Sequence, residues 1–367
     1  MDSIRYGLIG AGMMGQEHIR NINLLPNTRI TAVADPNEPM RSMSVALAGD
    51  QATGFADFQQ LLAADLCDAY VIAAPNDLHA MIMTEVMKTD KPILCEKPIT
   101  TTVADCNALL HQSRDRKAPV WVAMEYRYMP PVQRLMALLD EGRAGPPRMM
   151  SIREHRFPFL PKVDDWNRFS ARTGGTLVEK CCHFWDLMRL VLQSDPVRVF
   201  ASGAIDVNHV AERYDGRQPD ILDNAYVVVD FANGARAMLD LCMFAEGSYW
   251  QEVISVTGDR ARIDALIPGP ARFSIDGEER NAEVVVADRK DKKEVREIVP
   301  VDETILQAGD HHGSTFFQHQ RFADLVRNGS GEPEVSLEDG YWSVLVGTAA
   351  EQSARRGEAV VLTALKR

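Results

Sequence analysis

The chain has 367 residues, of which 46% are hydrophobic and 25% are charged, and its formal net charge is −12. This much apolar material can fill two hydrophobic cores, which excludes a mainly disordered chain and favours two domains. An acidic chain lacks the basic surface that attracts nucleic acids and anionic membranes, so neither is an expected partner.

Targeting signals and cysteine usage point to one compartment. No apolar run reaches the ~18 residues that a membrane-spanning helix needs. The N-terminal residues lack the basic region, apolar stretch and cleavage site of a signal peptide. The six cysteines show no CxxC pair and no zinc spacing, so we expect reduced thiols in a cytoplasmic protein.

The first third of the chain alternates short apolar runs with segments of helical spacing. Strands are predicted at residues 6–9, 30–34, 69–73, 92–95 and 120–123. Helices are predicted at residues 12–25, 39–48, 58–63, 78–88 and 102–116. Because the strands are almost continuously hydrophobic, both of their faces should be buried. Residues 1–124 are therefore predicted to form an α/β domain, an N-terminal Rossmann fold with a doubly wound parallel sheet.

From residue 125 the pattern changes. Helices are predicted at residues 131–141, 175–192, 314–328 and 337–356. Strands are predicted at residues 225–231, 235–244, 284–287 and 297–301, and the first two flank the hairpin signal Asn233-Gly234. The charged run 288–294 between the last two is predicted to be a solvated loop.

Residues 125–367 are thus expected to form a C-terminal α+β domain for substrate binding and oligomerisation. Its large, mostly antiparallel open sheet has one face packed and one face available. A homodimer or homotetramer through that free face is expected. Whether the last helix packs back on the first domain stays open.

The strongest local motif is Gly10-Ala11-Gly12-Met13-Met14-Gly15, which follows a predicted strand and opens a predicted helix. Gly10 permits the tight turn, Gly12 lets a pyrophosphate approach the backbone, and Gly15 lets the helix pack on the strand. The free N–H groups of the helix N-terminus favour phosphate binding. We therefore expect Gly10, Gly12, Met13, Met14 and Gly15 to bind a dinucleotide.

Asp35 lies at the end of the second predicted strand, twenty residues after Gly15. A carboxylate there accepts hydrogen bonds from both ribose hydroxyls and repels a 2′-phosphate. No arginine directly follows Asp35, so NAD is favoured over NADP as the cofactor.

Two further runs lie just past the carboxyl ends of predicted strands, where doubly wound sheets bind their ligands. One runs from Ala74 and Pro75 through Asn76 to His79, and the other contains Glu96, Lys97 and Pro98. We assign Ala74, Pro75, Asn76, His79, Glu96 and Lys97 to the cofactor site. Oxidation of an alcohol needs a group that takes the hydroxyl proton, and Lys97 is placed to take part in that transfer.

Glu179 and His183 are four residues apart in the predicted helix 175–192, which would place them on one face. A histidine can accept and donate protons near neutral pH. Lys97, Glu179 and His183 are therefore the candidate catalytic residues. Asp186 receives no firm role, and His18 is interpreted as a packing or surface residue.

Together these motifs resemble the glucose–fructose oxidoreductase, inositol dehydrogenase and rhizopine-catabolism (Gfo/Idh/MocA) oxidoreductases. The resemblance covers essentially the whole chain, and the motifs occur in the expected order. They are 10–15 with Asp35, 74–79, Cys95-Glu96-Lys97-Pro98, Arg127-Tyr128-Met129-Pro130, and 174–179 with His183 and Asp186.

The resemblance implies roles for individual residues. His183 would accept the proton and Lys97 would stabilise the alkoxide, although the two roles can exchange. Arg127 would belong to the cofactor site. Residues in segments that line the sugar pocket of relatives are Tyr126, Trp166, Arg168, Arg172, His311 and His312. Lys97, Glu179 and His183 would also contact the substrate, and no metal site is expected.

The chain departs from the family pattern next to the proposed base. Glu179 stands where relatives usually have Asp, and Lys180 and Cys181 replace an apolar residue and Gly. Lys180 is expected to point away on the helix, with service to an acidic substrate as the alternative. Cys181 and Cys182 are expected to be small buried residues rather than a disulfide.

The expected function is an NAD-dependent dehydrogenase that oxidises a secondary hydroxyl of a cyclic sugar, sugar derivative or inositol. Two alternatives remain. The same site could support glycoside hydrolysis through transient oxidation of the sugar, or the protein could be a nucleotide sensor without turnover. Retention of Lys97, Glu179 and His183 argues against the sensor.

Overall fold

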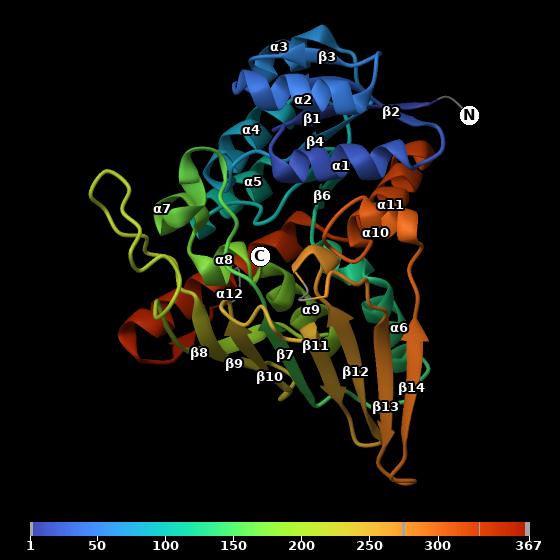
Figure 1. Ribbon diagram of the computed structural model, residues 1–367, viewed down its shortest axis with the longest axis vertical. Coiled ribbons are helices and arrows are strands. Elements are labelled where there is room, and N and C mark those ends of the chain that lie inside the picture. The colour runs from blue at the N-terminus through green and yellow to red at the C-terminus, as the bar shows by residue number, and fades with distance from the viewer. Residues whose placement is uncertain (1–2, 274–275, 330, 364–367) are drawn as a thin grey trace.

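The computed structural model describes residues 3–273, 276–329 and 331–363. It contains two sheets, one above the other in Figure 1, with α8, α9 and α12 between them. Met1 and Asp2, which precede the first predicted strand, lie outside the described residues. None of the described helices combines the length and the apolarity that crossing a membrane requires.

The N-terminal sheet is parallel throughout and has the order β3-β2-β1-β4-β5-β6. Its strands are β1 (Ile4–Ile9), β2 (Thr28–Ala34), β3 (Thr53–Phe55), β4 (Ala69–Ile72), β5 (Ile93–Cys95) and β6 (Val120–Val122). Its helices are α1 (Met13–Asn23), α2 (Glu38–Ala48), α3 (Phe58–Ala64), α4 (His79–Val86) and α5 (Val103–Gln112). The predicted doubly wound sheet is confirmed. The additional β3 is three residues long and has no apolar run by which to predict it.

The second sheet has nine strands in the order β14-β13-β12-β11-β7-β10-β9-β8-β15. They are β7 (Met149–His155), β8 (Pro196–Ala204), β9 (Asn224–Phe231), β10 (Arg236–Cys242), β11 (Trp250–Thr257), β12 (Ala261–Pro268), β13 (Ala282–Asp288), β14 (Glu294–Val299) and β15 (Val360–Val361). All of its pairs are antiparallel except β7 with β10. The Asn233-Gly234 hairpin and the charged turn before β14 are confirmed.

The remaining elements connect the two sheets. The longer ones are α6 (Pro130–Asp140), α9 (Cys182–Leu192), α11 (Ser314–Asn328) and α12 (Leu337–Arg356). The shorter ones are η1 (Asn76–Leu78), η2 (Glu125–Tyr128), η3 (Val163–Arg168), α7 (Ser170–Thr173), α8 (Thr176–Glu179), η4 (Ala271–Phe273) and α10 (Glu303–Gln307).

The single helix predicted over residues 175–192 is wrong, because the chain breaks it into α8 and α9. The break takes the carbonyl of Leu177 out of the helical hydrogen-bond pattern, and the Trp185 indole N–H donates to it at 2.8 Å. It also leaves the carbonyl of Glu179 free to accept hydrogen bonds from the Lys97 ammonium and the Cys182 thiol. Glu179 and His183 therefore lie on two short helices rather than on one face.

Helix α12 joins the two halves of the molecule. Its first turns pack on the N-terminal sheet, where Gly340 lies against Ile99 and Val122. Further along, Gly347 lets α12 approach α8 so closely that a Cβ would sit 2.5 Å from the carbonyl oxygen of Leu177. The rest of α12 packs on β8 and α9.

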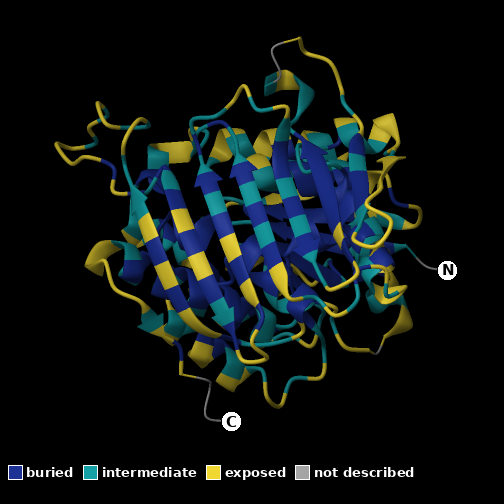
Figure 2. Ribbon diagram, turned by 90° about the horizontal axis from the view of Figure 1, so that it is seen from below, coloured by how far each residue is buried: buried dark blue, intermediate teal, exposed yellow. Residues whose placement is uncertain are grey.

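The outer face of the nine-stranded sheet alternates exposed and buried residues along several strands (Figure 2). Large apolar side chains are exposed on three neighbouring strands of this face. Val228 on β9 pairs with Phe200 on β8 and with Met238 on β10, and all three are exposed. One face of this sheet is thus packed under helices, and the other presents apolar side chains outward.

Candidate active site

The carboxyl ends of β1, β2, β4, β5 and β6 meet at one edge of the parallel sheet, as parallel topology requires. Each of these ends carries one of the predicted cofactor or catalytic segments. Helices α8 and α9 lie between this edge and the nine-stranded sheet (Figure 1). The site is therefore formed between the two sheets.

The glycine loop has the shape that a pyrophosphate requires. Gly10 has φ +98°, and a Cβ there would sit 2.5 Å from the carbonyl of Ala73. A Cβ at Gly15 would sit 2.2 Å from the Gly10 oxygen. At Gly12, by contrast, a Cβ would meet nothing within 4 Å, and no side chain caps the N-terminus of α1. An open space in front of an uncapped helix N-terminus fits a bound phosphate.

Asp35 directly follows β2 and is held toward this loop. Its carboxylate accepts hydrogen bonds from the Ala11 amide at 2.7 Å and the Asn37 amide at 2.8 Å. Arg41, one turn into α2, donates to the backbone carbonyl of Asp35 at 2.6 Å. An arginine therefore does lie near Asp35, but it is bonded to the backbone.

His79 joins the loops that follow β4 and β5. One ring nitrogen lies 2.9 Å from the Ala74 carbonyl and the other lies 2.8 Å from the carbonyl of Pro98, whose peptide bond with Lys97 is cis. Burial lowers the pKa of His79. A neutral imidazole has one N–H, so His79 donates to one of these carbonyls and packs against the other, between the two loops. In the same segment Asn76 is buried, and its amide nitrogen has no partner among the described residues.

Lys97 reaches from the β5 loop to α8. Its ammonium donates to the backbone carbonyl of Glu179 at 3.3 Å. Burial acts to lower the pKa of Lys97, but nearby acidic groups, first Cys182 and then Glu96, raise it above its usual value. Lys97 is therefore an ammonium ion at neutral pH, which suits it to stabilise an alkoxide.

His183 is buried and stacks on Tyr126 of η2, with ring centroids 4.1 Å apart and planes 8° apart. Burial lowers the pKa of His183 well below its usual value, and the positive charges of Lys97 and Lys180 lower it further. Its Nδ1 atom has no hydrogen-bond partner among the described residues. A neutral imidazole with an unused nitrogen can accept a proton.

Glu179 is also buried at the site, with one carboxylate oxygen, Oε2, lacking a partner among the described residues. Burial raises its pKa, while the charges of Lys162 and then Lys97 act in the opposite direction. A carboxyl group with an unfilled hydrogen-bonding position is available to a hydroxyl of a ligand.

Lys180 points into the protein, which corrects the expectation that it points away. Its ammonium lies 2.6 Å from the Tyr126 hydroxyl and 2.8 Å from a carboxylate oxygen of Glu154 on β7. The Tyr126 hydroxyl in turn donates to Glu252 on β11 at 3.2 Å. Lys180 thus compensates charge inside the protein and is already paired. Cys181 and Cys182 are both buried free thiols, as expected.

Glu154 and Glu252 are site residues that the sequence analysis missed. They stand opposite each other on the antiparallel pair β7 and β11. Burial and then the Glu154 charge raise the pKa of Glu252 to about 7. A detectable signal was present, because in each strand the glutamate continues the row of buried residues that includes Ile152 or Ile254.

The predicted aromatic and basic contacts lie on η3 and α7. Trp166 is buried with the Lys162 ammonium 5.4 Å from its ring and the Arg172 guanidinium 5.9 Å away. Arg172 pairs with Asp77 at 2.9 Å, and Arg168 pairs with Glu212 at 3.1 Å. Both arginines therefore have carboxylate partners already, and Lys162 is a further basic residue that the sequence analysis did not name.

The guanidinium of Arg127 is bonded to other segments of the protein. It forms a bidentate pair with Asp186 of α9, including a bond of 2.6 Å from Nε, and it donates to the Glu334 carbonyl. Its N–H groups thus serve α9 and the segment before α12, which gives Asp186 a structural role. Arg127 as a cofactor ligand stays a prediction.

His18 is also buried, not exposed. Its ring lies 3.0 Å from the Glu96 carboxylate and 2.7 Å from the ring of His319 on α11. Glu96 accepts in addition from the Lys97 amide at 3.1 Å. His18 therefore supports the loop that carries Lys97 and is a packing residue.

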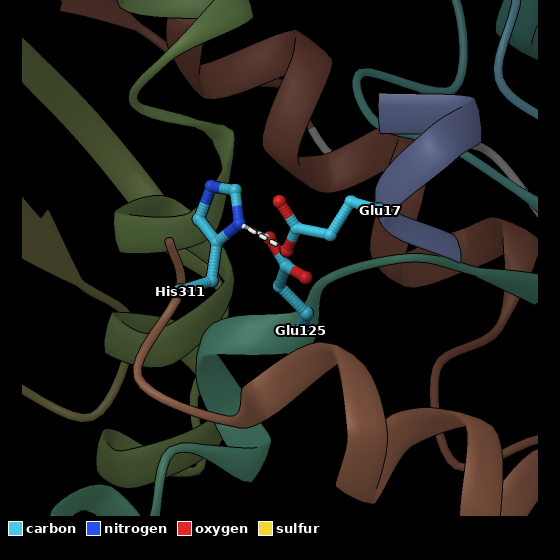
Figure 3. A group of neighbouring side chains, drawn as sticks. All are labelled: Glu17, Glu125 and His311. Carbon is cyan, nitrogen blue, oxygen red and sulfur yellow. Dashed lines mark hydrogen bonds and ion pairs between the residues drawn. The ribbon is translucent and has the colours of Figure 1, made fainter. Parts of the chain in front are cut away.

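The buried Glu17 of α1 and Glu125 of η2 come together with the half-buried His311 (Figure 3). The His311 ring centroid lies 6.4 Å from that of Tyr126. His311 lies 2.8 Å from Glu17, and the Thr315 hydroxyl contacts Glu17 at 2.8 Å and Glu125 at 2.6 Å. One hydroxyl proton cannot serve both carboxyls. The Thr315 hydroxyl therefore donates to one carboxyl at a time, and burial raises the pKa of Glu125.

The same group fixes the charge of His311. Burial acts to lower its pKa, but the carboxyls of Glu125 and Glu17 outweigh burial and raise the pKa to about 9. His312 next to it is different, since burial lowers its pKa to about 4 and its Nε2 has no partner among the described residues.

Comparison with known proteins agrees with this geometry. Residues 4–124 match the family model described as "Oxidoreductase family, NAD-binding Rossmann fold". Residues 136–362 match "Oxidoreductase family, C-terminal alpha/beta domain". The inositol 2-dehydrogenase of Rhizobium meliloti is 29% identical over 74% of this chain and 78% of its own. The myo-inositol 2-dehydrogenase of Thermotoga maritima is 25% identical over 98% of each chain.

Among solved structures, levoglucosan dehydrogenase in complex with NADH and levoglucosan has a TM-score of 0.82. It is 20% identical to this chain and covers 98% of it and 99% of its own length, so the likeness is one of fold. The glycine loop, the open space at Gly12 and the place of Asp35 fit NAD as the cofactor. Because both family models match in order and together span nearly all of its length, this chain belongs to the Gfo/Idh/MocA family of NAD-binding oxidoreductases.

Proposed function

We propose that the protein oxidises a secondary hydroxyl of a carbohydrate or polyol to a ketone. The observation that carries the proposal concerns two residues. His183 is buried and neutral, and the charge of Lys97, which follows the parallel strand β5, acts on it. One group can take a proton and the other can stabilise negative charge on oxygen, which is what alcohol oxidation requires.

The residues of the chain divide the work. His183 accepts the hydroxyl proton, and Tyr126 holds its ring by stacking. The Lys97 ammonium stabilises the alkoxide as the carbon loses hydride. Glu179 binds a neighbouring hydroxyl through its free oxygen. NAD, held by the glycine loop and Asp35, supplies the hydride acceptor.

The test is a screen of sugars, polyols and glycosides with NAD that follows two signals. Reduced nicotinamide should accumulate in proportion to the ketone product. Release of the aglycone from a glycoside with only trace NAD, and without net reduction, would support redox-assisted hydrolysis instead. The absence of both signals with every compound would contradict both the dehydrogenase and the hydrolase. A protein that binds NAD without turnover would be a sensor.

A further inference from the structure

Most basic side chains around the site have a carboxylate partner. Arg168, Arg172 and Lys180 pair with glutamate or aspartate at 3.1, 2.9 and 2.8 Å. These charges are compensated within the protein, so none of them calls for an anion. A binding position for an anionic ligand is expected where a cation has no such partner.

Lys162, which precedes η3, is such a position. Among the residues that the structure describes, its ammonium makes no hydrogen bond or ion pair, and its close contact is with the Trp166 ring at 5.4 Å. Its side chain is partly buried. An ammonium that is partly withdrawn from water and has no hydrogen-bonded partner costs free energy unless a ligand supplies one.

Lys162 and Arg172 both lie against the Trp166 ring, and Arg172 pairs with Asp77 of η1, which connects Lys162 to the loop that follows β4. Among the charges that lower the pKa of Glu179, the charge of Lys162 has the largest effect, ahead of that of Lys97. Neither lysine makes an ion pair with that carboxyl, since Lys97 bonds to the backbone carbonyl instead. Glu179 keeps its free Oε2 atom. The charges of two ammonium groups thus act on one buried carboxyl with which neither makes an ion pair.

We propose that the substrate is a sugar acid, a polyhydroxylated monocarboxylate, and that Lys162 binds its carboxylate. The inference rests on the proposed function and narrows its substrate class. Beside Lys162, the free Oε2 atom of Glu179 offers an acceptor to a hydroxyl of the same ligand. Because Arg168 and Arg172 already pair with carboxylates, Lys162 supplies one positive charge, which matches the single charge of a carboxylate better than the two charges of a phosphate dianion.

The experiment measures binding without turnover. The complex with NADH is titrated with matched pairs, such as glucuronate against glucose and galacturonate against galactose, and binding is followed by tryptophan fluorescence and calorimetry. Because NADH cannot accept hydride, an alcohol substrate stays unreacted. At least one acid is expected to bind about 10- to 100-fold more tightly than its neutral counterpart, the range for one charged hydrogen bond.

Variants assign the preference to one side chain. Lys162→Met should abolish the difference between acid and neutral sugar, Lys162→Arg should retain part of it, and Lys290→Met, which removes a charge from an exposed loop, should retain all of it. Equal or tighter binding of the neutral sugars, no binding of any acid, or an unchanged acid preference in Lys162→Met would overturn the inference. Tight binding of acids that is lost in Lys162→Met, without reduction of NAD by any of them, would leave Lys162 as the carboxylate-binding residue and contradict the proposed function.

Discussion

At the residue scale, the neutral His183 and the charged Lys97 lie in one buried site because opposite environments act on them. His183 has cations around it and Lys97 has acidic groups around it. Groups whose environments drive their pKa values apart can divide acid–base work between them. This division, rather than the presence of either residue alone, is the basis of the proposed chemistry.

Removal of either group should affect the chemical step and spare the binding of NAD. Lys97→Met keeps most of the side-chain length, and His183→Asn keeps a polar shape. Each variant should lose ~10²–10⁴ in kcat, because a positioned acid–base group contributes about that much. NAD affinity, measured by fluorescence titration, serves as the control. Retention of more than about a third of kcat by Lys97→Met would remove Lys97 from the mechanism.

Lys180 should tune the base through Tyr126, on which His183 stacks. Lys180→Met removes a positive charge that disfavours the imidazolium, so the pKa of His183 rises. The acidic limb of kcat/KM for oxidation should therefore move to higher pH by about half a unit or more. A ¹⁵N titration of His183 reports the same shift without turnover. An unchanged limb, with Lys290→Met as control, would show that Lys180 is only structural.

At the scale of elements, the strand–turn–helix unit β1-α1 combines two glycines with different tasks. Gly15 lies against the Gly10 carbonyl, and Gly12 faces open space. The first therefore serves packing of the helix on the strand, and the second serves access to the backbone.

Alanine substitutions should separate these tasks. Gly12→Ala has an ordinary φ of −70° and meets no protein atom, so thermal stability should change little while NAD affinity falls about tenfold or more. Gly15→Ala places a Cβ 2.2 Å from backbone, so it should lower the unfolding temperature. Calorimetry and NAD titration measure both effects. A Gly12→Ala protein with normal NAD affinity would contradict the assigned place of the pyrophosphate.

At the scale of the whole molecule, the pair of the buried Glu17 and the half-buried His311 ties α1 to the segment before α11. His311 has a pKa of about 9 in the folded protein against an ordinary value of 6.5. Its contribution to stability is thus fully present below pH 6.5 and is lost as the pH rises through 9.

The pH dependence of unfolding should show this. Wild type should exceed His311→Gln in free energy of unfolding by roughly 1–3 kcal/mol at pH 6. The difference should shrink between pH 6.5 and 9, as followed by urea denaturation at each pH. A difference that stays constant over this range would mean that His311 is not charged in the folded protein.

The outer face of the nine-stranded sheet should carry the oligomer. Exposed Phe200, Val228 and Met238 are contiguous across three strands, and apolar patches of this kind commonly mark interfaces. Val228→Lys should shift the protein to a smaller species in analytical ultracentrifugation, whereas Val295→Lys, at an exposed apolar position on the edge strand β14, should not. A wild-type monomer would refute this surface as an interface.

The sequence by itself determined the parallel sheet, the glycine loop and the position of Lys97 at a strand end. These features depend on residues close together in the chain, where apolar runs and turn chemistry act locally. The tertiary structure alone decided that Lys180 turns inward to Tyr126, 54 residues away, and that Arg127 pairs with Asp186, 59 residues away. It also decided that, within the described part of the chain, the Lys162 ammonium has no hydrogen-bond or ion-pair partner. Charges find their partners across segments that local patterns do not relate, because pairing depends on where the packed elements bring them.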